Sequence, residues 1–333
     1  MFSTVLKEFS GFLDKRFLAM IFAPSLAFWS LLVGLVTMTQ GIATSLRLWE
    51  RQPFAFQLFL IAIFLGWTLF FAYLLASLLT PLTKLFEGYW DDIWLLRWLG
   101  ENRRNQRRAE FDFLEQERKR LIDRGKSIQQ DLGAGSQIST VQHAKLHREL
   151  RQVEAERTAA YEKIYYHFPP TSRPEAIIPT RFGNIFKSTE LYPDVHYGID
   201  AVLLWPRLYH VLPTNVLESL GDAKSSMDFM LVVCTLSCVH AIAGGLIALI
   251  GGLNALVFLA VFAGSLLMCW LAYRGAIEAA LSYGQIIRTA FDLHRRDLLA
   301  SLGLDPPLDF MSERRLWSDI NMWLFRGSPE KLS

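Results

Sequence analysis

A histidine lies near the middle of a long apolar run, in the stretch TLSCVHAIAGG at residues 235–245, which contains Ser237 and His240. An imidazole takes up and releases a proton close to neutral pH, and a hydroxyl three residues earlier lies on the same face of a helix. Ionisable groups are rare inside a membrane because they are expensive to desolvate. Ser237 and His240 are therefore a candidate intramembrane polar site, and the expected partners of the ring are Ser237 itself and Thr68 or Tyr73 of an earlier apolar run. The alternative is a neutral ring that makes one hydrogen bond and only packs.

Three small residues follow His240 on the same helical face: Gly244, Ala248 and Gly251. Small residues at this spacing let two membrane helices approach closely. This candidate helix-packing face turns the imidazole toward protein or a water-filled path and leaves the opposite, aliphatic face to lipid.

Arg274 and Glu278 follow the last apolar run and are four positions apart. If subunits assemble around an axis, these candidate inner-mouth charges form a ring. The alternative is one exposed pair on a helix, which contributes only about 0.3 to 0.5 kcal/mol.

The elements that position these residues are apolar and long. The chain of 333 residues is 52% hydrophobic, and the apolar residues concentrate in four runs, each long enough for the ~20 residues that cross a hydrocarbon core. The runs are Phe17–Met38, Leu58–Leu79, Met227–Ile250 and Leu253–Tyr273, the last two joined by the turn GGLN. We expect an all-α integral membrane protein with four transmembrane helices, a helical cytoplasmic insertion between the second and third, and a helical C-terminal extension.

Orientation follows from Lys and Arg, which concentrate on the cytoplasmic side of membrane proteins. Basic residues precede the first run and follow the last, and the segment from Pro81 to Ser226 holds 21 Lys and Arg against 20 Asp and Glu. Both termini and the insertion are therefore expected in the cytoplasm, in a multi-pass protein of the cell inner membrane. The first run is too long for a typical signal peptide and is interpreted as an uncleaved span.

Five segments are predicted. They are an N-terminal interfacial helix with the first transmembrane hairpin (1–100), a cytoplasmic helical hairpin (101–168), a Pro-rich linker with a small aromatic-rich region (169–226), a second transmembrane hairpin with an extended helix (227–303), and a cytoplasmic tail (304–333). Within the first segment, residues 83–100 predict a continuous or gently broken helix.

The hairpin prediction depends on two apolar patterns separated by GAGSQIS at residues 133–139. Spacings close to 3.5 residues are typical of a helix seam, and the glycines and serines favour a turn. The expected seam contains Phe111, Leu114, Leu121, Ile128 and Leu132 in the first helix and Val141, Leu146, Leu150, Val153, Ala160 and Ile164 in the second.

Two features complete the cytoplasmic part. Ala201–Leu204 with Trp205 is too short to span and is expected to stop at Pro206, either as a surface element or inside a compact packed region with a buried tryptophan. The tail helix SERRLWSDINMWLF has a plausible N-cap at Ser312.

Several classes of protein are disfavoured. The sequence has no phosphate-binding loop, dinucleotide-binding turn or zinc-type cysteine cluster, so we expect no enzyme, cofactor or metal. The net charge of +2 gives no reason to expect nucleic acid.

The order of elements is similar to that of bestrophin channels and flagellar-motor stator subunits, which both form rings. The first hypothesis is thus a homo-oligomeric inner-membrane channel or pore-like assembly, in contact with membrane lipids and gated or recruited through its cytoplasmic helices. The alternative is a non-conducting membrane-anchored scaffold that docks a cytosolic partner through the 101–168 hairpin. A small-molecule carrier is a third possibility.

Overall fold

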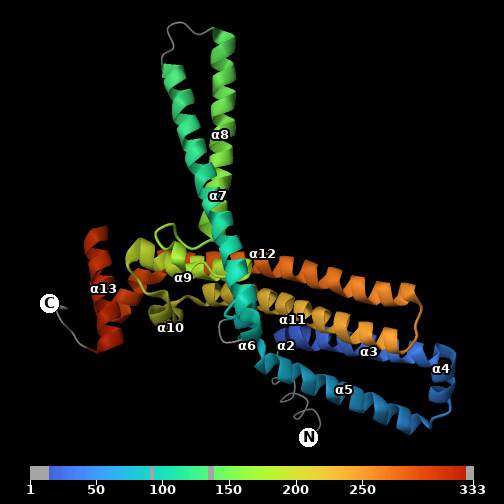
Figure 1. Cartoon of the computed structure of the whole chain (residues 1–333). Coiled ribbons are helices and arrows are strands. Elements are labelled where there is room, and N and C mark those ends of the chain that lie inside the picture. The colour runs from blue at the N-terminus through green and yellow to red at the C-terminus, as the bar shows by residue number, and fades with distance from the viewer. Residues whose placement is uncertain (1–14, 91–93, 134–138, 328–333) are drawn as a thin grey trace. The chain divides into compact units, whose positions relative to one another are not determined.

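The computed structural model describes residues 15–90, 94–133 and 139–327, and this part of the chain is helical without strands (Figure 1). Its helices are α2 (Lys15–Phe17), the π-helical turn η1 (Leu18–Phe22), α3 (Ala23–Gln40), α4 (Ile42–Glu50), α5 (Phe54–Ser77), α6 (Leu79–Glu87), α7 (Trp94–Gly133), α8 (Thr140–His167), the 3-10 turn η2 (Pro174–Ala176), α9 (Arg181–Tyr197), α10 (Ala201–Val211), α11 (Thr214–Ile250), α12 (Ala255–Ser301) and α13 (Phe310–Arg326). The predicted all-helical fold is confirmed.

The chain forms two compact units. The first combines the chain up to Lys84 with Gly221–Ala280, and the second combines Leu85–Leu220 with the chain from Leu281 onward. Helices α11 and α12 each contribute residues to both units because each is one uninterrupted helix. The interfacial helix expected before residue 15 lies outside the described residues.

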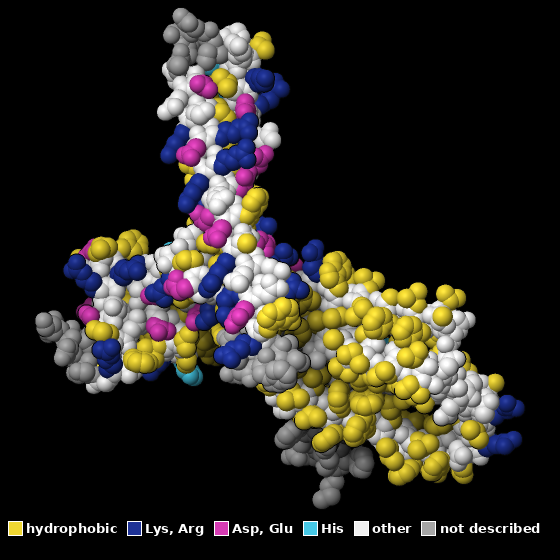
Figure 2. Space-filling model, viewed as in Figure 1, with side chains coloured by type: hydrophobic (Ala, Val, Ile, Leu, Met, Phe, Trp, Pro, Cys, Tyr) yellow, Lys and Arg dark blue, Asp and Glu magenta, His cyan; other side chains and the backbone are white. Residues whose placement is uncertain are grey.

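Four helices are long and apolar enough to cross a membrane, as predicted: Leu18–Gln40, Phe54–Ser77, Thr214–Ile250 and Ala255–Ser301. Hydrophobic side chains occupy much of the face of the first unit that is visible in Figure 2. The third helix begins at Thr214, well before the predicted Met227, because no breaker follows Pro213. The turn between the last two helices is tight, as expected, with Gly252 at φ 64° and the side chain of Asn254 accepting from the N–H of Leu256.

Helices α7 and α8 of the second unit pack as an antiparallel hairpin (Figure 1). The predicted seam is largely confirmed: Leu121, Ile128 and Val153 are buried there, and Arg124 and Glu149 form an ion pair of 2.6 Å between the helices. Val141 is the exception, at 80% exposure. Gly125 of α7 lies opposite Val153 of α8. Because the two helices are antiparallel, Val141, twelve residues before Val153, lies beyond the end of α7 at Gly133.

Helix α6 ends at Glu87, before Gly88 with its φ of 96°, and α7 begins at Trp94. Residues 83–100, predicted as a continuous or gently broken helix, are therefore not continuous. Thr180, the N-cap of α9, contacts the chain where α6 ends. Its hydroxyl donates to the carbonyl of Glu87 (2.8 Å) and accepts from the N–H of Gly183 (2.9 Å). The buried amide of Asn184 closes the loop by donating to the carbonyls of Ile178 and Thr180 (2.7 and 2.6 Å).

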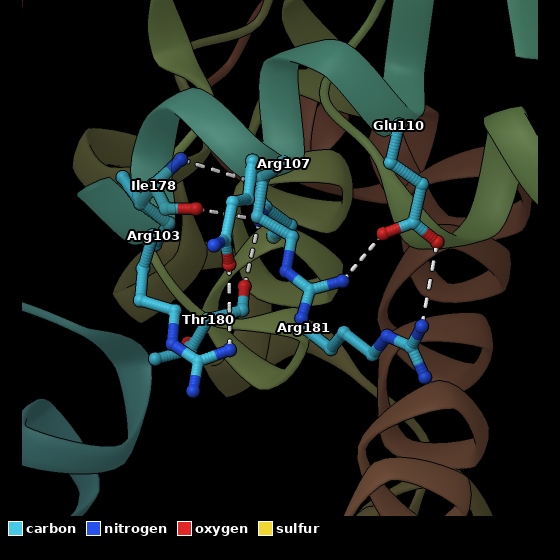
Figure 3. Close-up of polar contacts among 8 residues, drawn as sticks. Arg103, Arg107, Glu110, Ile178, Thr180 and Arg181 are labelled. Atoms are coloured by element: carbon cyan, nitrogen blue, oxygen red, sulfur yellow. Dashed lines mark hydrogen bonds and ion pairs between the residues drawn. The ribbon is translucent and has the colours of Figure 1, made fainter. Parts of the chain in front are cut away.

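An arginine-rich turn of α7 contacts the same end of α9. In Figure 3 the carboxylate of Glu110 lies between the guanidinium groups of Arg107 and Arg181, while Arg103 hydrogen-bonds Gln106 of its own helix. These ion pairs are partly exposed, and such pairs each stabilise by about 0.2 to 1 kcal/mol. These ion pairs therefore contribute more to the orientation of α9 against α7 than to the stability of the contact.

The core of the second unit is formed by α10, α13 and the last turns of α12. Leu204, Leu208, Phe291 and Trp317 are buried in it. Helix α10 runs through Pro206 to Val211, so the predicted stop at that proline is wrong. The proline removes one backbone hydrogen bond of the helix. The burial of Leu204 and Leu208 on one face of α10 offsets this loss. The structure has the predicted compact region with a buried tryptophan, but the buried tryptophan is Trp317 of α13.

Helix α13 is capped by Asp309 rather than by the predicted Ser312. The Asp309 carboxylate accepts from the N–H groups of Met311 and Ser312, both at 3.0 Å. Serine and aspartate are both preferred N-cap residues. Asp309, three residues before Ser312, also carries a full negative charge, which is favourable at a helix N-terminus.

Truncation of the hairpin seam should destabilise the chain. Ile128 is 4% exposed, so Ile128→Ala should lower the free energy of unfolding by about 2 to 4 kcal/mol through the cavity it leaves. The matched change Val141→Ala should have almost no effect, since Val141 contacts mainly solvent. Thermal melts of the helical circular dichroism signal in detergent would measure both, and equal melting temperatures would contradict the assigned register.

The cap of α13 predicts a pH dependence. Hydrogen bonds from the side chain and the backbone of Ser312 lower the pKa of Asp309 from its usual value. Its stabilising contribution is therefore complete above the unfolded value of about 3.9 and is lost as pH falls through the lower folded value. Asp309→Asn cannot titrate, so the difference in Tm between wild type and variant should shrink below about pH 4. A difference that grows on acidification would contradict this assignment.

Candidate functional site

His240 lies in α11 of the first unit and is 8% exposed. Its Nδ1 is 2.8 Å from the Oγ of Ser265 on α12, and the Ser265 hydroxyl donates to the carbonyl of Val261 at 2.7 Å. A serine hydroxyl carries a single hydrogen, so the bond to His240 is made by Nδ1–H donating to Oγ. The second ring nitrogen, Nε2, is buried and has no hydrogen-bond partner among the described residues.

The partner of the ring is thus Ser265, which sequence reasoning did not name. Of the expected partners, Thr68 donates its hydroxyl to the carbonyl of Phe64 in its own helix (2.8 Å), and Tyr73 stacks on Phe17 with ring centroids 4.5 Å apart. Ser237 has no side-chain hydrogen bond within the described part of the chain. Ser265 could have been found only by knowing the register of α12 against α11.

Two further buried polar atoms lie in α3 of the same unit. The Oγ of Ser25 and the Nε1 of Trp29 are one turn apart and have no partner among the described residues. Phe28 lies between the two polar regions, with its ring 5.4 Å from that of Trp29 and 6.1 Å from that of His240 in edge-on contacts. The resulting cluster contains polar groups but no carboxylate, Lys or Arg. Neither Ser25 nor Trp29 was among the predicted site residues, although their spacing of four places them on one helical face.

Two of the small residues after His240, Gly244 and Gly251, face side chains of α3 and α12. A Cβ added to Gly244 would be 3.1 Å from both Leu35 of α3 and Val261 of α12, and one added to Gly251 would overlap Thr39. Ala248 is fully buried. A side chain at position 251 would therefore force Thr39 to move, whereas at position 244 the ends of the Leu35 and Val261 side chains would have to shift only slightly.

Arg274 and Glu278 do not contact each other in this structure. Both are exposed, and no ion pair joins them within the described chain. The guanidinium of Arg274 instead lies over the ring of Trp270, 5.2 Å from its centroid.

No family model matches the chain, and neither the curated proteins nor the solved structures that were compared with it gave a significant match. Among the described residues, no three His, Cys, Asp or Glu side chains gather as metal ligands would. The site is defined by its own geometry: one histidine with a free acceptor nitrogen, a serine partner and an aromatic neighbour.

A double-mutant cycle would test the hydrogen bond between His240 and Ser265. Ser265→Ala should destabilise the chain, and in the background of His240→Leu the same change should have a smaller effect, with a coupling of about 0.6 kcal/mol as is typical of hydrogen bonds between membrane helices. Ser237→Ala is the matched control and should not couple to His240→Leu. Chemical unfolding in mixed micelles measures all variants, and equal coupling for Ser237 and Ser265 would refute the assigned partner.

Proposed function

We propose that this chain is the subunit of a homo-oligomeric channel or pore-like assembly of the inner membrane, gated or recruited through its cytoplasmic helices. In this arrangement both termini and the α7–α8 hairpin are cytoplasmic, as the distribution of Lys and Arg favours. The polar cluster around His240 then lies within the bilayer.

The observation that carries the proposal is the small buried fraction of the four apolar helices. In their most apolar windows 28%, 17%, 39% and 6% is buried, in chain order. The last value belongs to α12, so most of the surface of its apolar part is left uncovered by its own chain, although Ser265 and Val261 contact α11. Such a helix faces either lipid alone or another subunit.

The exposed surface of α12 favours a second subunit. Ala260 and Gly264 are exposed one turn apart, and an added Cβ at Gly264 would meet no atom within 4 Å. Membrane helices associate through such small residues because the backbones can then approach closely, whereas surfaces that contact only lipid carry large aliphatic side chains without restriction.

Conduction is supported by the polar atoms around Phe28. Unsatisfied buried polar groups are costly, and in membrane proteins they commonly line ion or water paths. The Nε2 of His240, the Oγ of Ser25 and the Nε1 of Trp29 can each hydrogen-bond water. An aromatic side chain beside a neutral polar path can act as a hydrophobic gate that closes by expelling water.

One observation favours the alternative, a non-conducting scaffold. The hairpin presents apolar side chains on its outer surface, with Phe113 65%, Val141 80% and Tyr161 53% exposed. Charged side chains of both signs are spread along the visible face of the hairpin (Figure 2). Exposed aromatic groups on the hairpin are suited to docking a cytosolic protein. A membrane anchor needs such a docking surface as much as a channel does.

Gly264→Leu should dissociate the assembly by filling the face of α12, weakening association at least about tenfold, or 1.4 kcal/mol. Gly66→Leu makes the same change on α5, where Ala62 and Gly66 are also small, exposed and one turn apart. It should leave the oligomer intact, and dissociation by Gly66→Leu alone would assign the interface to α5 instead. Native mass spectrometry of detergent-solubilised protein would count the subunits. A monomer in the wild type, or an unchanged oligomer in Gly264→Leu, would overturn the assignment of α12 to the interface.

Conductance in liposomes separates the channel from the scaffold. The purified wild type should carry ionic current, and His240→Leu should fold but alter the current, because leucine cannot hydrogen-bond water. His240→Gln keeps a polar side chain and should lie between the two. A bilayer that stays electrically tight with oriented wild-type protein, under voltage and mechanical stimulus, would leave only the scaffold.

A further inference from the structure

The second unit buries three charged side chains, and one of them has no counter-charge. Arg288, Arg295 and Glu313 are 6%, 9% and 2% exposed. Arg295 donates from Nε to Glu313 at 2.6 Å, and Arg296 adds a second ion pair to the same carboxylate at 3.5 Å. Arg288 forms no ion pair with a carboxylate in the described chain. A buried cation is costly unless it is paired, and arginine cannot lose its charge in a protein.

The surroundings of Arg288 satisfy only part of its guanidinium. Its Nη2 donates to the hydroxyl of Ser188 (2.6 Å) and to the carbonyl of Tyr165 (3.2 Å). Its central carbon lies 4.6 Å from the ring centroid of Tyr165 and 5.2 Å from those of Tyr166 and Tyr192. Tyrosine rings attract a cation but accept no strong hydrogen bond. Nε and Nη1 have no hydrogen-bond partner among the residues that the structure describes.

The nearest carboxylate along the helix is committed elsewhere. Asp292, one turn after Arg288, accepts hydrogen bonds from the hydroxyl groups of Tyr192 (2.9 Å) and Tyr197 (2.7 Å). Burial and the bond to Asp292 raise the pKa of Tyr197 to about 12, so its hydroxyl stays protonated and continues to donate. The aspartate thus holds two rings in place and is not a partner of the guanidinium.

Arg288 lines a cavity of about 270 Å³ in this unit. Aromatic side chains, including Tyr161 and Phe168, form its walls, and Thr171 lies exposed at its edge. The other arginine of the cavity, Arg118, is neutralised by a two-point contact with Glu115 at 2.9 and 3.2 Å. Arg288 is therefore the unneutralised charge of the lining. The volume approaches that of cavities that hold small organic ligands.

We propose that this cavity is a binding site for a small organic oxyanion, a carboxylate or a phosphate, which supplies the counter-charge of Arg288. The anionic group accepts hydrogen bonds from the guanidinium, as such groups do from arginine, and the tyrosine walls contact the remainder of the ligand. Arg288 and Ser265 belong to the same uninterrupted helix α12, but the site does not depend on whether the assembly conducts.

The test uses the full chain in detergent micelles with two probes, inorganic phosphate and benzoate, at constant ionic strength. Titration calorimetry should detect binding of at least one probe, and at about five times Kd the Tm should rise by about 2 to 4 °C. The responding probe distinguishes a phosphate from a carboxylate ligand. Chloride at the same ionic strength is the reference for non-specific salt effects.

Two variants remove the site in different ways. Arg288→Gln deletes the charge, and Thr171→Trp fills the cavity from its exposed edge without changing Arg288, so it remains informative if the first variant does not fold. Arg124→Gln and Thr158→Trp make the same changes at exposed positions of the hairpin and should bind as wild type does. Loss of binding in either folded cavity variant, with both controls unaffected, supports the proposal. Wild-type protein that binds neither probe, or folded cavity variants that bind as well as wild type, would overturn it.

Discussion

The uncovered apolar surface of α3, α5, α11 and α12 is the constraint on which the rest of this structure depends. Helices with so little of their apolar surface buried within the chain require an environment that does not oppose this exposure, and a hydrocarbon interior is such an environment. Each helix satisfies its backbone hydrogen bonds internally, so only side chains decide which helices meet. At Gly251 an added Cβ would overlap the side chain of Thr39, so a small residue is needed there.

The two units treat polar groups in opposite ways. In the first, the cluster around Phe28 has free donors and acceptors but no charge. In the second, charges are buried, and their partners are aromatic rings, hydroxyls and one carboxylate that pairs with Arg295. A neutral polar group can remain unsatisfied in the first environment at moderate cost, whereas an unpaired cation in the second is far more costly. This difference is why Arg288 indicates a missing ligand more strongly than His240 does.

The hairpin of α7 and α8 combines a buried seam with exposed aromatic side chains. Its seam buries large aliphatic side chains, among them Leu121 and Ile128, and an ion pair between Arg124 and Glu149 joins the two helices. The exposed aromatic groups on its surface contribute nothing to that seam. Tyr161 belongs both to the exposed surface of α8 and to the cavity that Arg288 lines, so a partner bound there and a ligand bound in the cavity would contact the same ring.

The sequence by itself determined the helical class, the four apolar helices, the hairpin seam and the tight turn before α12. These features depend on periodicity and on local turn preferences, which neighbouring residues specify without reference to the rest of the chain. Only the tertiary structure decided that His240 meets Ser265 across that turn, that α10 continues through Pro206, and that Tyr165 and Tyr192 surround Arg288 from more than ninety positions away in sequence. Which helical faces come together depends on the packing of distant segments. The sequence of one helix does not specify its register against a neighbouring helix.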